Sequence, residues 1–498
     1  MTYTFNAYLK TRSKNTFQDD AVLQTCLKKL APPHSRGMTA KKELLEIGKY
    51  AAETMPSLSQ TAARKENEPK LHPYNAFNER IHDIEIHAST QKLMQDLYNF
   101  KLGFSNGNIF EHYAKLYLIA QNGEAGVCCS LACSDGLERI LRKYKGQNKI
   151  LKKAHWDLTH PTPNQFYHGA QFVTEIQGGS DVAANEVKAV LKGKDWSISG
   201  HKWFCSNITA NYFLVTAKCE ENGKLDKNVS LFLVPNIPTT YEVHRLKDKL
   251  GTRELPTAEV TFQDAKATLV GPRGKGVSLV VSEVLVTSRM HCIMAACALL
   301  KKAHREVEAY THFRHAFGRP IHHYSLVQKT LDELKIEHEK ITYGFFHLLK
   351  RWEASQKNPK TKDAIDTRIL ISLMKPYATW KATYFLHEAM MLLAGNGIEE
   401  QFSQLPRLFR DAVIYETWEG AHFVLLTQAY KDMKVFGIDQ DTAGFVKRIL
   451  GKHHPLENTL KGILQEKDSQ RALLQFKNWA TQFISLFLLM DQSIGYDF

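Results

Sequence analysis

Between residues 165 and 262 the hydrophobic pattern changes from a helical period to short strand-like segments, and it changes back after Gly274. These segments are rich in β-branched and aromatic residues and are separated by Gly, Asn, Asp and Lys turns. Such spacing is typical of a compact all-β barrel or sandwich. The predicted strands cover residues 165–174, 186–191, 196–199, 212–217, 229–234, 241–246 and 258–262.

The sequence on both sides of this β stretch has apolar residues at helical spacing. The fold class is therefore α+β, in the order helical, β, helical. We expect the motif Gly395-Asn396-Gly397 to end a long helix and residues 405–410 to form a short connection. Helices are predicted at 41–53, over most of 89–152, and at 277–313, 325–353, 362–393, 442–450, 456–465 and 471–490. The predicted domains are an N-terminal helical domain (1–164), a β domain (165–273), a C-terminal helical bundle (274–434) and a helical extension (435–498).

Composition describes a soluble globular protein, with 43% hydrophobic and 23% charged residues among 498. The formal net charge of +13 favours anionic partners such as nucleic acid, acidic membranes or phosphorylated ligands, and simple solubility explains it equally well. No apolar run reaches the length that we expect of a membrane span. The N-terminus is polar and carries no secretory signal, so we expect a cytoplasmic protein. The eight cysteines lack metal-ligand spacing and are expected to be reduced thiols, with no metal site predicted.

The stretch Ile414–Gly420 places Glu419 between Trp418 and a glycine. A carboxylate held there and partly desolvated suits a general base, because burial raises its pKa toward neutrality. The alternative is that Glu416 and Glu419 are acidic residues at a helix N-terminus, where negative charge is favourable.

Three other stretches carry residues suited to binding a ligand. Residues 171–182 contain Thr174 followed by the loop Gly178-Gly179-Ser180, which offers hydroxyls and backbone N–H groups to phosphates or to the polar edge of a ring; an ordinary glycine turn is the alternative. Residues 200–207 combine adjacent aromatics with a Ser-Asn corner, and we expect Trp203 to lie in the core and Cys205 to be a buried apolar residue. Residues 313–320, followed by Gln328, bring two arginines to a helix end, which suits pyrophosphate recognition.

Together, in this order, these stretches resemble the acyl-CoA dehydrogenase family over roughly residues 75–430. The resemblance implies FAD as the cofactor. It implies that Thr174 contacts the isoalloxazine, that Phe204 and Ser206 lie at the same ring, and that Ser180 lies near the mouth of the ligand channel. It also implies that the diphosphate and adenosine part of FAD is bound across a subunit boundary by Arg314, Phe317 and Gln328. The loop with Gly395 and Gly397 is implied to bind this same part of the cofactor.

The same resemblance places Glu419 at the position of the catalytic base. Some family members carry the base immediately before a core arginine, which here is Arg289; the residue before it is Ser288, and this supports Glu419. The implied reaction is α,β-dehydrogenation of an acyl-CoA thioester: Glu419 takes the α-proton, its backbone N–H helps to stabilise the carbonyl oxygen, and the β-hydride passes to flavin N5. The resemblance also implies a role in fatty acid metabolism, an electron-transfer flavoprotein as electron acceptor, and assembly into a homotetramer or homodimer.

Within the family the chain is most similar to the branch of AidB-like alkylation-response flavoproteins, in residues 174–182, 200–206, 246–251 and 418–420. That branch carries FAD and is associated with DNA binding through its C-terminal extension. Here Lys and Arg nearly balance Asp and Glu from residue 431 onward, which weakens the case for DNA. Two alternatives to the dehydrogenase remain: an AidB-like flavoprotein whose main role is to bind nucleic acid, and an acyl-CoA oxidase that uses oxygen.

Overall fold

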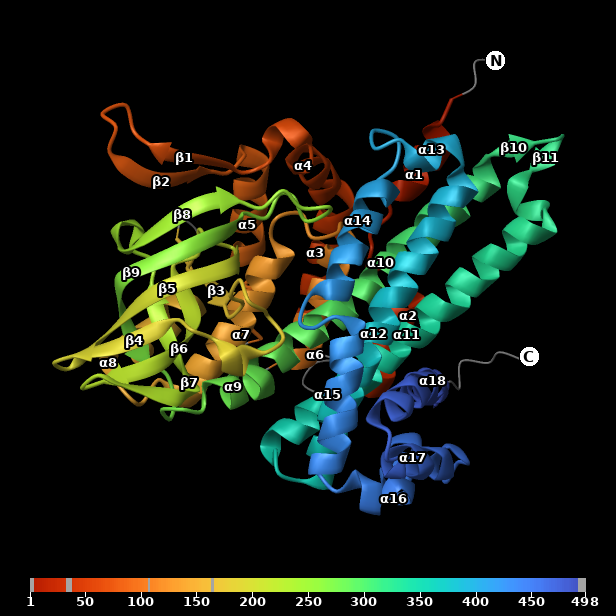
Figure 1. Ribbon diagram of the computed structural model, residues 1–498. Helices are drawn as coiled ribbons and strands as arrows, with labels where there is room; N and C mark the ends of the chain where they lie inside the picture. Colours follow the sequence, from red (N-terminus) through yellow and green to blue (C-terminus); the bar gives the residue numbers. More distant parts are fainter. Residues whose placement is uncertain (1–3, 33–37, 106–107, 163–164, 491–498) are drawn as a thin grey trace. The chain divides into compact units, whose positions relative to one another are not determined.

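The computed structural model describes residues 4–32, 38–105, 108–162 and 165–490 (Figure 1). The chain forms two compact units. The first contains residues 1–53, 108–121 and 289–498, and the second contains residues 54–107 and 122–288. The predicted N-terminal segment therefore contributes residues to both units, and the division into four consecutive domains stays a prediction.

The second unit is built around a barrel of antiparallel and parallel strands, which confirms the predicted β stretch. The pairings β6–β4, β4–β5, β5–β9, β9–β7 and β7–β6 close a ring, so these five strands have no free edge between them. Strand β3 pairs with β6 in parallel, and β8 pairs with β9. The strands are β3 (Gly169–Phe172), β4 (Lys188–Lys192), β5 (Asp195–Ser206), β6 (Tyr212–Glu221), β7 (Lys224–Pro235), β8 (Tyr241–Leu246) and β9 (Thr257–Leu269).

Alternation along the strands divides the apolar residues between two cores. Phe172, Phe213 and Phe262 are buried inside the barrel. The opposite faces of β6 and β7 present leucines that pack against the helices α7 and α8. The helices of this unit are α4 (Met55–Ala62), α5 (Ala88–Asn99), α7 (Cys128–Tyr144), α8 (Lys149–Thr159) and α9 (Gly276–Leu279), which continues as a π-helical turn (Val280–Leu285).

A two-stranded hairpin in the second unit was not predicted. It consists of β1 (Lys70–Tyr74) and β2 (Arg80–Glu85), which pair antiparallel. Neither strand has a buried residue, and only Leu71 and Ile84 pack against the barrel core, so the apolar pattern by which strands are recognised in a sequence is weak here.

The first unit is helical. Three of its helices match the sequence prediction at both ends: α12, α16 and α17. The helix α12 contains Pro376 in its interior. The helices are α1 (Asn6–Arg12), α2 (Ala21–Leu30), α3 (Met38–Glu53), α6 (Ile109–Ala120), most of α10 (Val286–Phe313), α11 (Ser325–Lys357), α12 (Lys362–Leu393), α13 (Gly395–Ile398), α14 (Leu405–Thr417), α15 (His422–Val435), α16 (Thr442–Leu450), α17 (Leu456–Gln465) and α18 (Ser469–Leu488).

Two local predictions in this unit were wrong. Residues 405–410 are not a connection but the first turns of α14, which begins with Pro406 in its first turn, where a missing N–H costs no helical hydrogen bond. The helix α12 ends at Leu393 and is capped by Ala394, whose φ is 52°, and Gly395 and Gly397 lie in the short helix α13 that follows. The glycines therefore begin the next turn instead of closing the long helix.

The prediction that no apolar run is long enough to span a membrane was also wrong. Among the described residues, Gly276–Phe313 is one helical run of 38 residues with a mean hydropathy of 1.4 in its most apolar window. However, 89% of that window is buried inside the protein, as is expected for a core helix.

Candidate active site

Glu419 lies in the short loop between α14 and α15. The helix α14 ends at Thr417, Trp418 is extended, and Glu419 and Gly420 have φ angles of 57° and 106°. A left-handed conformation costs a residue with a Cβ on the order of 1–3 kcal/mol, and it persists only where the surroundings hold it. Glu416 is in the last turn of α14, so the alternative of two acids at a helix N-terminus was wrong.

The side chain of Glu419 is partly buried. Burial raises the pKa of its carboxyl to about 7, against the opposing effect of the Arg289 guanidinium and the Lys375 ammonium. A carboxyl with a pKa near neutrality can both accept and release a proton at physiological pH. This is the electrostatic setting that general-base catalysis requires.

Two buried cations hold the main chain of this loop. Arg289 donates from Nε to the carbonyl oxygen of Glu419 at 3.2 Å and from Nη1 to Ser372 Oγ at 3.3 Å. Lys375 donates from Nζ to the carbonyl oxygens of Glu416 at 2.9 Å and Gly420 at 3.0 Å. The sequence identified Arg289 only as a core arginine and gave no sign of Lys375, because a lysine in a long helix is expected to be exposed.

In the second unit, Thr174 lies two residues beyond β3, and its carbonyl oxygen accepts a hydrogen bond from the backbone N–H of Trp203 at 3.0 Å. This bond joins the Thr174 segment to β5, which carries Phe204 and ends at Ser206. The structure thus joins the segment with Thr174 to the strand that carries Phe204 and Ser206. Ser180 lies further along the loop and is exposed.

A buried ion pair fixes the chain immediately after Thr174. Lys202 is fully buried, and its Nζ lies 2.7 Å from Glu175 Oε1 and 3.1 Å from Thr216 Oγ1. The same carboxylate accepts the backbone N–H of Glu186 at 2.6 Å and of Val187 at 3.3 Å. Sequence reasoning missed this pair, because nothing in the pattern shows that two residues 27 positions apart meet.

The ring of Phe204 is 49% exposed, which is unusual for a phenylalanine on a barrel strand. The Lys247 ammonium lies 4.6 Å from the centre of this ring and 3.3 Å from that of Trp203. Trp203 is partly exposed beneath this cation, so its predicted place in the core was wrong. Cys205 is buried as predicted, and burial raises the pKa of its thiol.

In the first unit, a tight hairpin follows α10 and carries Phe317 at its tip. Strands β10 (His315–Ala316) and β11 (Arg319–Pro320) pair, with Phe317 and Gly318 at φ angles of 49° and 86°. Phe317 is 97% exposed, and Arg314 at the end of α10 is exposed as well.

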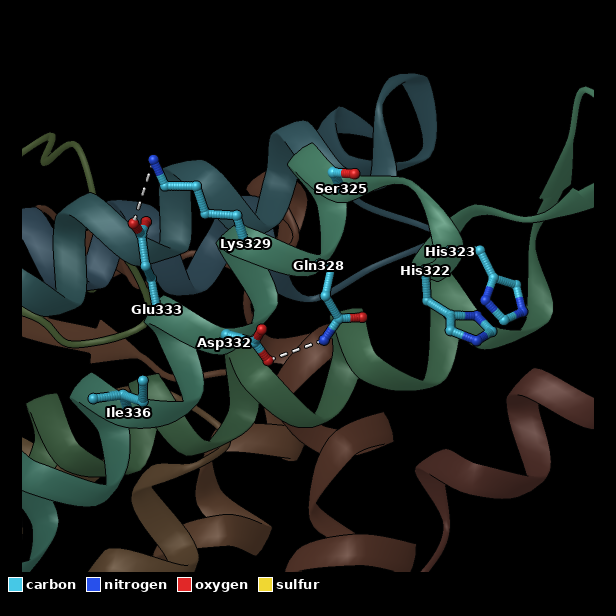
Figure 2. Close-up of a pocket in the computed structure, with 8 residues that line it drawn as sticks. All are labelled: His322, His323, Ser325, Gln328, Lys329, Asp332, Glu333 and Ile336. Atoms are coloured by element: carbon cyan, nitrogen blue, oxygen red, sulfur yellow. Dashed lines mark hydrogen bonds and ion pairs between the residues drawn. The ribbon is translucent and has the colours of Figure 1, made fainter. Parts of the chain in front are cut away.

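Gln328 lies on the first turns of α11, in an open pocket of about 580 Å³ (Figure 2). Its Nε2 donates to Asp332 Oδ1 at 3.0 Å. The neighbouring His322 stacks on His312 with ring centres 3.9 Å apart. The pocket is lined by His322, His323, Ser325, Gln328, Lys329, Asp332, Glu333 and Ile336.

The two predicted glycines differ in what surrounds them. A Cβ at Gly397 would lie 2.0 Å from the carbonyl oxygen of Met390, so no side chain fits there. A Cβ at Gly395 would meet nothing within 4 Å. Gly397 is therefore required for close approach of the main chain, and Gly395 is not.

Three family domains match successive parts of the sequence. Residues 6–158 match the N-terminal domain of the adaptive response protein AidB, residues 170–265 match the acyl-CoA dehydrogenase middle domain, and residues 274–434 match the acyl-CoA dehydrogenase C-terminal domain.

The chain belongs to the acyl-CoA dehydrogenase family.

Its relatives within the family include the putative acyl-CoA dehydrogenase AidB of Escherichia coli, with 28% identity over 76% of this chain and 71% of that protein. Acyl-CoA dehydrogenase family member 11 of Caenorhabditis elegans is 26% identical over 93% of this chain and 78% of that protein. The solved structure of Caenorhabditis elegans ACDH-11 in complex with C11-CoA has a TM-score of 0.85 at 23% identity and covers 97% of this chain and 89% of that chain. A glutaryl-CoA dehydrogenase from Mycobacterium smegmatis in complex with FADH2 has a TM-score of 0.61 at 18% identity over 80% of this chain and 95% of that chain.

Members of the acyl-CoA dehydrogenase family are FAD oxidoreductases, and the residues of this chain fit that cofactor. In the second unit, β5 carries the exposed ring of Phe204 and the hydroxyl of Ser206, and its residue Trp203 is hydrogen-bonded to the Thr174 main chain; an exposed aromatic ring and hydroxyls on joined segments suit a planar ring with a polar edge. In the first unit, an exposed phenyl ring and an exposed arginine stand at one hairpin, which suits an adenine and a diphosphate.

Proposed function

We propose that this protein catalyses the α,β-dehydrogenation of an acyl-CoA thioester, with Glu419 as the base that removes the α-proton. The observation that carries the proposal is the state of Glu419: its carboxyl has a pKa raised to about 7, and its main chain is held in a left-handed conformation by two buried cations. Glu416, the other carboxylate near this loop, is a weaker candidate for the base, since it lies inside α14.

In this proposal, the residues of the chain position the substrate and the cofactor and remove the α-proton. Glu419 as carboxylate accepts the α-proton, and its backbone N–H stabilises the negative charge that develops on the thioester oxygen, where pre-set donors have their largest effect. FAD, when bound, supplies the acceptor for the β-hydride. Thr174, Phe204 and Ser206 hold the ring, with Ser180 at the mouth of the ligand channel.

The remaining predicted contacts belong to the other end of the cofactor. We assign Arg314, Phe317 and Gln328 to its diphosphate and adenosine part, together with the turn that contains Gly395 and Gly397. Because Phe317 is almost fully exposed, we expect this contact to be made across a boundary with a second copy, in a homodimer or homotetramer. An electron-transfer flavoprotein is the expected acceptor, and a cytoplasmic location is expected.

The test is anaerobic reduction of the flavin by a series of acyl-CoA chain lengths that includes the C11 thioester. We expect at least one thioester to bleach the yellow flavin. Glu419→Gln should keep FAD and lose this reaction, while Glu416→Gln should retain it; Glu416 is the matched control because burial also raises the pKa of its carboxyl. An oxidised flavin throughout the whole series would reject the proposal.

The two alternatives give different results on the same sample. An oxidase would release hydrogen peroxide during turnover in air. A nucleic-acid-binding flavoprotein would be retained on duplex DNA, and the retention would fall steeply with salt.

A further inference from the structure

The first unit contains a buried lysine to which the proposed reaction assigns no role. Lys375 lies in the middle of α12, and its side chain is fully buried. Lysines are almost never fully buried unless they are paired. Within the described part of the chain, however, its ammonium forms no ion pair within 4.0 Å and donates to main-chain carbonyls instead.

The two carbonyls that it contacts flank the base. One belongs to Glu416, in the last turn of α14, where helical carbonyls lack N–H partners and favour a cation. The other belongs to Gly420, the residue immediately after Glu419. A single ammonium thus closes the loop that carries the base, from the helix end on one side to the glycine on the other.

The loop needs such support because its main chain is strained. Glu419 has a φ of 57°, a region that residues with a Cβ rarely occupy. Arg289 holds the carbonyl oxygen of Glu419 itself at 3.2 Å. The two cations come from different helices, α10 and α12, so the loop is fixed from two directions.

We propose that Lys375 is a positioning residue for Glu419: its ammonium clamps the loop at residues 416 and 420 and stabilises the base in its carboxylate form. The proposal rests on the proposed function of Glu419 as base. It adds a residue that does not touch the substrate or the cofactor but sets the conformation and the charge of the group that does.

The clamp is expected to respond to pH. Burial lowers the pKa of Lys375 to about 8. As the pH rises through this value, the ammonium loses its charge and one of its donors, so the hold on both carbonyls weakens. The titratable and charged groups that face Lys375 are Arg289 and Cys292 from α10, Glu416 from α14, Glu419 from the loop and His422 from α15.

The test uses the full-length, FAD-loaded protein and the variant Lys375→Met, which keeps the length of the side chain and removes the charge. The first readout is hydrogen–deuterium exchange of the amides of residues 414–422 at pH 7. We expect exchange to be at least about tenfold faster in the variant, because an opened loop exposes these amides. The second readout is the pH midpoint of flavin reduction by a reactive acyl-CoA, which should rise by about one pH unit when a stabilising cation is lost.

The matched control is Lys302→Met. Lys302 lies on α10, burial lowers its pKa to about 8 as well, and its ammonium lies 3.6 Å from Glu306. This variant removes a comparable buried lysine elsewhere in the same unit and should change neither readout. Unchanged exchange and an unchanged midpoint in Lys375→Met would overturn the proposal and leave Lys375 as a core residue only.

A second measurement covers the case in which Lys375→Met does not fold. In the unaltered protein, exchange protection of residues 414–422, corrected for the intrinsic pH dependence of exchange, should fall above about pH 8. Constant protection up to pH 9.5 would contradict the clamp. The exchange readouts need no acyl-CoA, so they can succeed or fail independently of the proposed reaction.

Discussion

The guanidinium Nε of Arg289 lies 3.2 Å from the carbonyl oxygen of Glu419, although 130 residues separate them in the chain. The conformation of the proposed base is therefore held in part by a residue at the start of the helical bundle, far away in the sequence. This contact links the charge of the site to its geometry, because the cation that holds the loop also opposes the rise that burial causes in the pKa of the Glu419 carboxyl.

The rate of flavin reduction should rise with pH with a midpoint near 7. The base acts only as a carboxylate, and burial holds the pKa of Glu419 at about 7. Stopped-flow reduction by a saturating acyl-CoA between pH 5 and 8 measures this limb. A midpoint near 4.5 would mean that the carboxyl is fully hydrated and would contradict the assigned environment.

Glu419 should also lower the stability of the folded protein as the pH rises from 4.5 to 7. Its pKa is higher in the folded state, at about 7, than the ordinary value of 4.5, so the folded state binds the proton more tightly across this window and loses that advantage as the pH rises. Glu419→Gln should flatten this decline and be more stable than the parent protein by about 1–3 kcal/mol at pH 8. Urea unfolding at pH 4.5 and pH 8 gives both values; equal stabilities of parent and variant at pH 8 would count against a desolvated carboxylate.

Removing the charge of Lys202 should cost about 3–5 kcal/mol of unfolding free energy, since Glu175 would then be buried without a partner. The matched control is Lys192→Met, whose partner Asp264 is exposed, and which should cost no more than about 1 kcal/mol. Chemical denaturation of the two variants provides the comparison. Similar losses in both would show that burial of the Lys202–Glu175 pair has no energetic importance.

The two glycines of α13 should respond differently to alanine. Gly397→Ala places a Cβ 2.0 Å from the carbonyl oxygen of Met390 and should destabilise the protein by about 1–3 kcal/mol and weaken FAD retention. Gly395→Ala meets nothing within 4 Å and should stay within about 0.5 kcal/mol of the parent. Thermal unfolding and flavin content measured side by side would decide; a tolerated Gly397→Ala would remove the argument for close approach.

Phe317→Ala should leave the stability of the apoprotein within about 0.5 kcal/mol of the parent, because the ring is 97% exposed. FAD binding should weaken by about 1–3 kcal/mol if the ring stacks on the adenine. Phe77, which is 84% exposed on the β1–β2 hairpin, is the matched control, and Phe77→Ala should not change FAD affinity. Fluorescence titration of apoprotein with FAD measures both variants, and equal affinities would remove Phe317 from the cofactor site.

Much of the fold could be predicted from the sequence, because periodicity reports burial. The seven strands of the barrel and the ends of α12 were recognised since their apolar residues follow a clear period. The β1–β2 hairpin was missed because neither of its strands has a buried residue. The start of α14 was missed because Pro406 interrupts the helical pattern, although proline is common in the first turn of a helix.

The candidate site was predictable only where a residue has a distinctive neighbour. Glu419 could be identified from Trp418 and Gly420, but its pKa and its left-handed conformation depend on contacts across the fold. The role of Lys375 could not be predicted, because a lysine in a helical pattern is expected to be exposed. Only the structure shows that it is buried and bound to the loop.

Pro376 gives the clamp a mechanical property. A proline has no N–H to donate, so the carbonyl oxygen of Ser372, one turn earlier, loses its helical hydrogen bond. Ser372 and Lys375, which reach Arg289 and the loop, therefore belong to the turn at which α12 is weakest along its own axis. Any bending of the long helix should therefore concentrate at this turn, next to the groups that hold the main chain of the proposed base.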